Sequence, residues 1–349
     1  MTPPSFSMTP PSFSRVSSVA FPRLHVMRDY ECSLLPGVNG NKARKLRTLL
    51  SDLPAAGIVS HGGAQSNAML ALSRVCHHHN VPFAYHTRAL PRWLRDCPVG
   101  NLRRALANGM TLREHPSAVA YDEAIQSMSA GGQSGVFVPQ GAAWPDAEVG
   151  VKGLAHDIQE WWTGPMRSRA SSKLSVVVPA GTGTTALYLA RHASAEMDVY
   201  AVPCVGDEAG LMRQMRSLDR ASGAHNIFPR ILSPPRALSV PFASPHAAVL
   251  ESWRVAVGTH GELLDLVYGA IAWGTLASHS WCPPASEPGS TSLYVNFGGH
   301  EGLGTSLSRY ARAGLLEDRE TAAMVLQEAL DAVAADGDAQ RFDLDEIGL

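Results

Sequence analysis

From about residue 40 onward, short apolar segments alternate along the chain with amphipathic stretches of helical length. The clearest apolar segment is LSVVVPA (174–180), which is rich in valine and is followed directly by the glycine-rich turn GTGTT (181–185). Strands that alternate with helices of about 10–15 residues are typical of α/β proteins with mainly parallel sheets. The sequence therefore predicts an α/β fold. Further strands are expected at residues 57–60, 81–86, 111–115, 136–139, 199–205, 263–268 and 293–298.

Helix signals fall between the predicted strands. Asn101 is expected to cap a helix that stops at Gly109, a residue type that commonly ends helices. One helix should follow GTGTT directly, and MRSRASSK (166–173) is expected to be a polar linker. Other helices are expected at residues 66–78, 121–130, 151–162, 208–221, 247–258, 302–313 and 320–334.

Length and composition narrow the class of protein. The 349 residues predict two domains with a core that needs no disulfides. The formal net charge of −2 offers no basic excess for nucleic acid, and no apolar run approaches the roughly 20 residues of a membrane helix. The five cysteines are scattered without a CxxC pair, which favours a reducing, cytoplasmic location. Three consecutive histidines (77–79) do not share a helix face, so no metal site is expected.

Both ends of the chain are expected to lie outside the main core. The sequence MTPPSFS occurs twice in tandem, at 1–7 and 8–14, and its Pro and Ser content predicts a disordered segment over residues 1–20. It has no apolar stretch after a basic start and so does not resemble a secretory signal. Residues 315–349 are expected to form a helical extension with an acidic end, which packs on the protein or forms part of a homodimer contact.

The turn after the 174–180 strand has the features of an anion-binding loop. Glycines let a ligand approach the backbone closely, and free N–H groups at a helix start bind an anion together with the helix dipole. The loop lacks the lysine of a Walker motif and the third glycine of the dinucleotide fingerprint, since Ala186 stands there. A phosphate cradle and a plain strand-to-helix turn are both compatible with these residues. The five residues are Gly181, Thr182, Gly183, Thr184 and Thr185.

Lysine is scarce in this chain. Only four of the 29 basic residues are lysines, namely Lys42, Lys45, Lys152 and Lys173. Two of them lie in GNKARKL (40–46), where a tight turn would hold Lys42 in a fixed position, as a lysine that forms a Schiff base requires. The alternative is a solvated helix start with Asn41 as its N-cap.

A second glycine turn, HGGAQSN (61–67), lies between a predicted strand and a predicted helix. Its helix N-terminus, with the hydroxyl of Ser66 and the amides of Gln65 and Asn67, suits a carboxylate or another small anion. The alternative is that Ser66 is an ordinary helix cap in a loop of structural glycines.

Together, and in this order, these segments resemble one family. This is the group of fold type II pyridoxal-phosphate (PLP) enzymes that contains 1-aminocyclopropane-1-carboxylate deaminase and D-cysteine desulfhydrase. The resemblance is collinear over about residues 40–300. It implies a tryptophan synthase β-like fold, with two open, mainly parallel α/β domains and PLP in the cleft between them. The motifs that carry it are GNKARKL, SHGGAQSN, GNLRRALANGMTL, VPQG, VVVPAGTGTT, LDLVYG and FGG.

The resemblance also implies how the domains divide the chain. Residues 21–47 and 156–314 would form a large PLP-binding domain, with a small α/β domain inserted at 48–155. Lys42 would bind PLP covalently and later move the proton at the substrate α-carbon or beyond. Asn67 would form a hydrogen bond with the ring hydroxyl of the cofactor.

Further roles follow from the same resemblance. Gln65 and Ser66, together with Asn67, would hold the substrate carboxylate, and Ser66 would assist proton transfer. The residues from Gly181 to Thr185 would hold the cofactor phosphate. Tyr268 matches a tyrosine of the family's active site.

Three positions depart from the family pattern. The glutamate that partners the pyridine nitrogen in the deaminase is Gly269 here, and the corresponding threonine of the desulfhydrases is Phe297. Asn296, Ser280 or a water molecule is left to reach that nitrogen. Phe242 replaces a second active-site tyrosine, which argues against opening of a cyclopropane ring.

These observations lead us to expect a PLP-dependent lyase or deaminase that acts on a small amino acid. The leading reaction is elimination and deamination of a D-cysteine-like substrate, giving a 2-oxo acid and ammonia. Alternatives are ring opening of 1-aminocyclopropane-1-carboxylate, racemisation or dehydration of a serine-like substrate, and PLP binding without catalysis. A phosphate- or nucleotide-binding protein without PLP, in which Lys42 is dispensable, is a further alternative.

Overall fold

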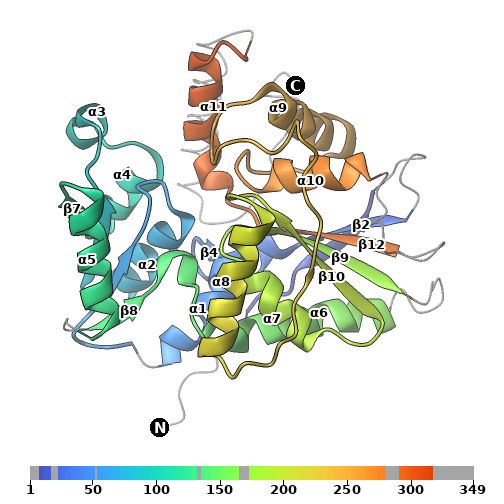
Figure 1. Ribbon diagram of the computed structural model, residues 1–349, viewed down its shortest axis with the longest axis horizontal. Helices are drawn as coiled ribbons and strands as arrows, with labels where there is room; N and C mark the ends of the chain where they lie inside the picture. Colours follow the sequence, from blue (N-terminus) through green and yellow to red (C-terminus); the bar gives the residue numbers. More distant parts are fainter. Residues whose placement is uncertain are drawn as a thin grey trace.

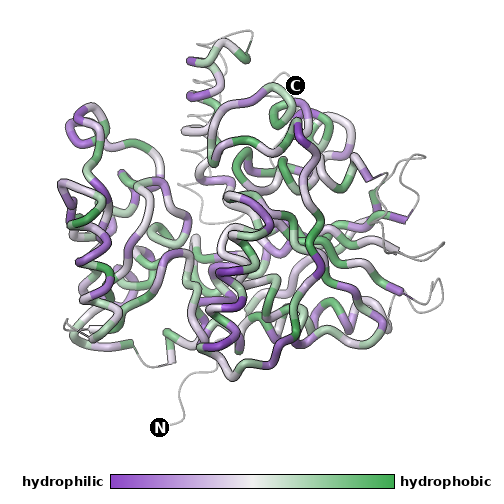
Figure 2. The backbone as a smooth tube through the Cα atoms, viewed as in Figure 1, coloured by the Kyte–Doolittle hydropathy of each residue, from purple (hydrophilic) through white to green (hydrophobic). Residues whose placement is uncertain are grey.

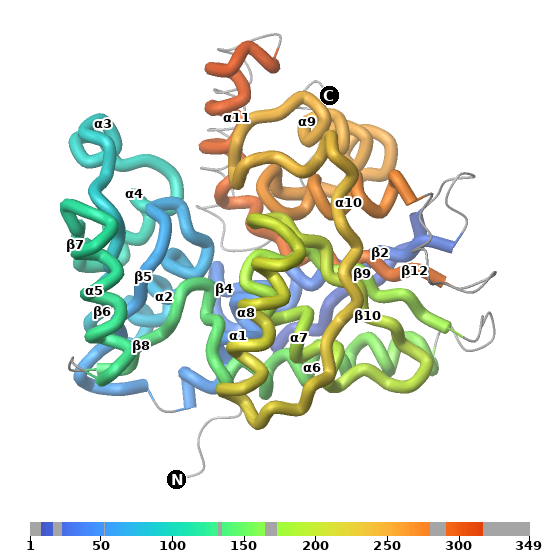
Figure 3. The backbone as a smooth tube through the Cα atoms, viewed as in Figure 1, coloured from blue at the N-terminus to red at the C-terminus, as the bar shows by residue number. Residues whose placement is uncertain are grey.

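The computed structural model of the chain describes residues 8–16, 23–51, 53–131, 135–164, 173–279 and 291–316. Its larger sheet has six strands in the order β1-β2-β12-β9-β10-β11. All neighbouring strands are parallel except β1 and β2, which are antiparallel. Figure 3 shows how β2, near the N-terminus, lies beside β12, near the C-terminus. The strands are β1 (Ser12–Arg15), β2 (Leu24–Arg28), β9 (Leu174–Ala180), β10 (Met197–Pro203), β11 (Arg230–Ile231) and β12 (Thr291–Asn296).

Helices cover both faces of the six-stranded sheet (Figure 1). Alternate residues of β9 explain this arrangement, because Val176 and Val178 belong to the apolar cluster that contains α6 and α7, whereas Val177 belongs to the cluster that contains α9 and α10. A strand that is buried on both faces reads as a continuous apolar run. These helices are α6 (Ala147–Thr163), α7 (Thr184–His192), α9 (Ala247–Arg254) and α10 (Gly269–Ser278).

The smaller sheet lies at the left of Figure 1 and has four parallel strands in the order β7-β6-β5-β8. Its strands are β5 (Ile58–His61), β6 (Phe83–Arg88), β7 (Thr111–His115) and β8 (Val136–Val138). The helices beside it are α2 (Asn67–His78), α3 (Arg92–Asp96), α4 (Gly100–Ala107) and α5 (Ala118–Ser129). Both sheets are thus mainly parallel, as the alternation of strands and helices predicted.

Three further α-helices lie in the described chain, which also has a two-stranded antiparallel sheet of β3 (Ser33–Leu35) and β4 (Val38–Asn39). Helix α1 (Gly40–Leu46) packs against α6 and α2, and α8 (Glu208–Ala221) packs against α7. Helix α11 (Leu303–Arg312) follows β12. Figure 2 shows hydrophobic residues along the strands of the six-stranded sheet and hydrophilic residues along much of α8. None of the helices that the structure describes is long and apolar enough to cross a membrane.

Three local predictions are wrong. Residues 12–15 are not disordered, because they pair with β2 as strand β1. The predicted strand at 263–268 is a turn, since the carboxylate of Asp265 accepts hydrogen bonds from the backbone N–H groups of Val267, Tyr268 and Gly269 and bends the chain into α10. Asn101 lies buried inside α4 and does not cap it.

The division into two domains stays a prediction, although the two sheets use separate stretches of the sequence. The expected boundary at residue 155 falls inside α6, which packs against α1 and α7. The predicted linker at 166–173, apart from its last residue, and the helix predicted at 320–334 lie outside the described residues, as does the extension beyond residue 316.

Candidate functional site

Lys42 is held in the first turn of α1. The helix starts at Gly40, where φ is +57° and where a Cβ atom would overlap the carbonyl oxygen of Phe297, so glycine permits this close approach. The N-cap position of the helix is Asn39, so the alternative in which Asn41 caps it does not hold. Instead the amide oxygen of Asn41 accepts a hydrogen bond from Lys42 Nζ at 3.0 Å.

The environment of Lys42 favours a neutral amine. Burial lowers the pKa of Lys42 to about 8 from an ordinary value of 10.5, and the nearby carboxylate of Asp265 opposes this shift. The neutral amine is the form that attacks a carbonyl carbon, and a pKa of about 8 gives it a much larger share near physiological pH than the ordinary value would. The position and the pKa together make Lys42 suited to nucleophilic chemistry.

The glycine loop joins β9 to the N-terminus of α7. Gly183 has φ +75°, and a Cβ atom there would overlap the side chain of Met215, so the backbone turns tightly before Thr184. The hydroxyls of Thr182 and Thr184 lie 2.9 Å apart. The buried hydroxyl of Thr185 has no hydrogen-bond partner among the described residues. Free N–H groups of the first helical turn and these hydroxyls form an anion-binding arrangement.

Tyr268 packs over this loop. Its Cε1 atom lies 3.0 Å from the position of a Cβ on Gly181, so a larger residue at 181 would displace the ring. Burial raises the pKa of the Tyr268 hydroxyl, and the charge of Asp265 raises it further, so the hydroxyl stays protonated. The ring of Phe242 is half-exposed and lies 5.8 Å from the Tyr268 ring, centroid to centroid. The structure thus brings together the glycine loop and two aromatic positions that are distant in sequence.

The second turn ends at Ser66, whose hydroxyl caps α2 by accepting a hydrogen bond from the N–H of Met69 at 3.3 Å. The side chain of Gln65 holds the start of α4: its Nε2 donates to the carbonyl of Val99, and its Oε1 accepts from the N–H of Asn101. The side chain of Gln65 is therefore occupied within the protein, while the roles predicted for Gln65 and Ser66 toward a substrate stay predictions.

Asn67 connects this turn to the rest of the site. Its Oδ1 accepts a hydrogen bond from Asn101 Nδ2 at 2.8 Å. Its Nδ2 lies 2.8 Å from the position of a Cβ on Gly299, and the Cβ of Asp265 lies 3.7 Å from the same point. Gly299 has φ +86°, so glycine allows Asn67 and Asp265 to approach each other here. Asn67, Asp265 and Lys42 are thereby gathered in one region.

Of the two side chains named as partners for a pyridine nitrogen, Asn296 and Ser280, the structure describes only that of Asn296. Both ends of the Asn296 amide are occupied, because Nδ2 donates to Leu263 and Oδ1 accepts from Gly298. Ser280 lies outside the described residues. A Cβ atom on Gly269 would lie 3.0 Å from Oδ2 of Asp265, so this carboxylate occupies the space beside the position where the family has glutamate.

Two residues of the site were missed by the sequence reasoning. Asp265 organises the turn before Tyr268, whereas its apolar neighbours in LLDLVY (263–268) predict a strand. Lys45, one turn after Lys42 on α1, has a buried amino group that donates to the carbonyl of Gly141 at 3.2 Å. A Cβ atom on Gly141 would lie 3.2 Å from Cγ2 of Thr182, so Lys45 lies near the glycine loop. The scarcity of lysine and the spacing of three residues were the available signals for Lys45.

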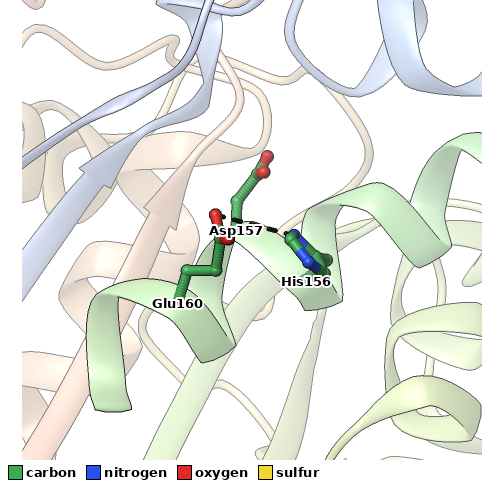
Figure 4. Close-up of side chains that lie close together, drawn as sticks. All are labelled: His156, Asp157 and Glu160. Atoms are coloured by element: carbon green, nitrogen blue, oxygen red, sulfur yellow. Dashed lines mark ion pairs between the residues drawn. The ribbon is translucent and has the colours of Figure 1, made fainter. Parts of the chain in front are cut away.

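One cluster has donor atoms that could hold a metal ion, but its groups are already paired. His156, Asp157 and Glu160 lie on one side of α6, as Figure 4 shows. Asp157 accepts a hydrogen bond from Arg44 at 2.7 Å, and exposed His156 and Glu160 lie 3.6 Å apart. We interpret the cluster as a helix surface with an ion pair to α1.

Comparisons with known proteins identify the fold. No family model matches the chain, and no curated protein matches it in sequence. A solved structure of an ACC deaminase homologue is 17% identical, covers 84% of this chain and 90% of that chain, and has a TM-score of 0.67. Maize serine racemase is 12% identical over 88% of this chain and 93% of that chain, with a TM-score of 0.59. A pyridoxal 5′-phosphate-dependent aspartate racemase is 13% identical over 84% of this chain and 90% of that chain, with a TM-score of 0.53.

These similarities confirm the predicted fold class. The chain has the α/β architecture of the fold type II PLP enzymes, with two mainly parallel sheets. At such low identity the similarity concerns the fold, and the chemistry has to be argued from the site.

Proposed function

We propose that this chain binds PLP, with Lys42 as the residue of covalent attachment and residues 181–185 as the phosphate site. One chain of contacts supports the proposal: Lys42, a part-buried lysine with a pKa of about 8, lies near Asp265, which organises the turn before Tyr268, and the Tyr268 ring packs against Gly181 of the glycine loop. The fit to a phosphate is supported by the hydroxyl of Thr185, which is buried and without a hydrogen-bond partner among the described residues. A phosphate oxygen would satisfy this hydroxyl and the N–H groups of the first turn of α7.

In this proposal each residue of the site has its own role toward the cofactor or the substrate. Bound PLP would supply an electron sink for negative charge at the substrate α-carbon. Lys42 would hold the cofactor and then accept or return a proton at that carbon. The N-terminus of α2, beginning at Asn67, would attract the substrate carboxylate through its dipole and free N–H groups. Tyr268, with its pKa raised by burial, would act as a protonated hydrogen-bond donor.

We propose that the reaction is an elimination on a small amino acid. With D-cysteine, the Cα–H and Cβ–S bonds break, and addition of water gives pyruvate, ammonia and hydrogen sulfide. Phe242 offers no hydroxyl that could assist opening of a cyclopropane ring, which favours elimination over that alternative. Racemisation or dehydration of a serine-like substrate needs the same proton transfer by Lys42.

A second candidate function is PLP binding without catalysis. The observation that favours it is the lack of a side-chain partner for a pyridine nitrogen among the described residues at the expected positions, since Asn296 is occupied and Gly269 and Phe297 offer no polar group. A less protonated ring is a weaker electron sink.

The absorption spectrum of the purified protein with PLP tests the proposal. A visible band should form in the wild type and in the control variant Lys152→Ala, whose side chain is exposed, and should be absent in Lys42→Ala. Adding D-cysteine to the loaded wild type should release sulfide and pyruvate. A band without turnover would favour the non-catalytic binder, and the lack of any band in the wild type at saturating PLP would refute PLP binding.

A further inference from the structure

The segment between β8 and α6 brings the small sheet into contact with the glycine loop. In this segment, which we call the strap (residues 139–142), Gly141 has φ +71° and Ala142 has φ +52°. A left-handed conformation is costly for alanine and persists only where the surroundings enforce it. Through Gly141 the strap contacts Lys45 of α1 and lies against Thr182 of the glycine loop.

His61 holds the other side of the strap. It is the last residue of β5, and its Nε2 accepts a hydrogen bond from the backbone N–H of Gln140 at 3.2 Å. Because Nε2 acts as the acceptor, the neutral ring carries its proton on Nδ1, which donates to the hydroxyl oxygen of Tyr121 at 2.8 Å. The ring also stacks on Phe137, with an interplanar angle of 7°. The imidazole is therefore fixed on both edges and on one face.

We propose that His61 is a positioning residue for the phosphate site: it holds Gln140, and through it Gly141, against Thr182 of the glycine loop. This inference rests on the proposed function, because the benefit of a fixed glycine loop is the binding of the PLP phosphate. His61 itself touches neither the loop nor Lys42 in the described contacts. Its effect passes through the backbone of the strap.

The arrangement requires a neutral ring, because an imidazolium has hydrogens on both nitrogens and cannot accept from Gln140. The titratable groups around His61 are His86 on β6 and Tyr121 on α5; the Tyr121 ring in turn meets Arg88 and His115. Burial and the positive charge that His86 would carry lower the pKa of His61 to about 4. The acceptor is thus available at neutral pH.

Three substitutions of His61 test its two ring nitrogens separately. His61→Gln retains an acceptor at about the distance of Nε2, His61→Asn retains a polar group only near Tyr121, and His61→Phe removes both while retaining the stack on Phe137. Hydrogen exchange of a peptide that spans the strap reports on the Gln140 bond without any cofactor. The dissociation constant of PLP, measured from the visible band, reports on the phosphate site. His78→Asn, on the exposed end of α2, is the control.

We expect the exchange of the strap to accelerate in His61→Asn and His61→Phe but not in His61→Gln or the control. The same two variants should bind PLP about three- to tenfold more weakly, the range expected for loss of one hydrogen bond that orders a site. Equal PLP affinity in His61→Asn and the wild type would overturn the inference. So would an equal loss in all three variants, which would indicate a packing role. Failure of the wild type to bind PLP would instead refute the proposed function, and hydrogen exchange would still decide whether His61 orders the strap.

Discussion

The glycine loop at 181–185, whose last two residues begin α7, and the turn at 62–66 each join a parallel strand to the N-terminus of a helix. In the glycine loop the hydroxyl of Thr185 has no partner among the described residues. In the other turn the hydroxyl of Ser66 caps its own helix, and both ends of the Gln65 amide bind the start of α4. Two turns of the same local type thus differ in how many of their side-chain groups are left for a ligand.

This difference follows from what packs beside each turn. The glycine loop is bordered by apolar and aromatic side chains, Met215 and Tyr268 among them, which fix its shape without using its polar groups. The turn at 62–66 is bordered by the start of α4, where the carbonyl of Val99 and the N–H group of Asn101 bind the Gln65 amide. A glycine turn before a helix therefore predicts where an anion could bind, and its neighbours determine which side chains are available.

The largest expected effect concerns the glycines themselves. Gly183→Ala should destabilise the fold by about 2–4 kcal/mol, because its φ of +75° disfavours alanine and the new methyl would overlap Met215. Gly63→Ala should change stability by less than about 0.5 kcal/mol, since a Cβ there meets nothing within 4 Å. Urea unfolding of both variants measures the contrast. Similar losses in the two variants would contradict the difference in packing.

Lys42 provides the next test, through the pH dependence of PLP capture. The neutral amine is the reactive form, so the rate should rise with pH up to the pKa of about 8 and then level off. Between pH 6.5 and 8 the expected rise is about fifteenfold for a single group with that pKa. Stopped-flow absorbance of PLP binding measures it. Substitutions in either turn should leave the midpoint unchanged, and a midpoint near 10.5 would show that burial does not tune Lys42.

Thr185→Val tests whether the glycine loop is free for a ligand. Since its hydroxyl has no partner among the described residues, the isosteric change should leave the melting temperature unchanged or raise it. The affinity for PLP should fall about tenfold, as expected when a hydrogen bond to a charged phosphate is lost. Calorimetry and equilibrium titration supply the two readouts. A loss of stability without a loss of affinity would mean that this hydroxyl is structural.

Gln65→Ala is expected to have the smallest effect. In contrast to Thr185→Val, it should lower stability more than affinity for PLP. It removes two hydrogen bonds to the start of α4 from an exposed position, so the free energy of unfolding should fall by about 1 kcal/mol. The affinity for PLP should change less than in Thr185→Val. Gln65→Glu keeps one acceptor for the N–H of Asn101 and should recover part of the stability. A stable Gln65→Ala variant that no longer binds amino acids would assign Gln65 to the substrate instead.

Much of the fold was predictable from the sequence because its signals are local. The strand at 174–180 and the helices at 66–78 and 208–221 were expected within one or two residues of their observed bounds. The strand expected at 263–268 failed because apolar residues around Asp265 resemble a strand, while its carboxylate binds the N–H groups that follow it. Strand β1 was missed because a proline-rich segment forms a strand here only by pairing with β2.

The candidate site was predictable in its position and less so in its contacts. Lys42 and the glycine loop stood out by residue type and spacing, since lysine is scarce and glycines before a helix form a recognisable turn. Lys45 and Gly141 could not be connected to the loop, because their contacts join α1, the strap and Thr182 across three separate parts of the chain. His61 was visible only as the residue before two glycines.

The sequence by itself determined the alternation of strands and helices, the scarcity of lysine and the location of two turns suited to anions. These properties depend on neighbours within a few residues, which the chain order specifies. Only the tertiary structure decided that Gln65 binds α4, that Asp265 bends the chain before α10, and that the strap meets Thr182. The physical reason is that a polar group is satisfied by whichever partner folding brings within hydrogen-bond distance, and that partner is usually far away in the sequence.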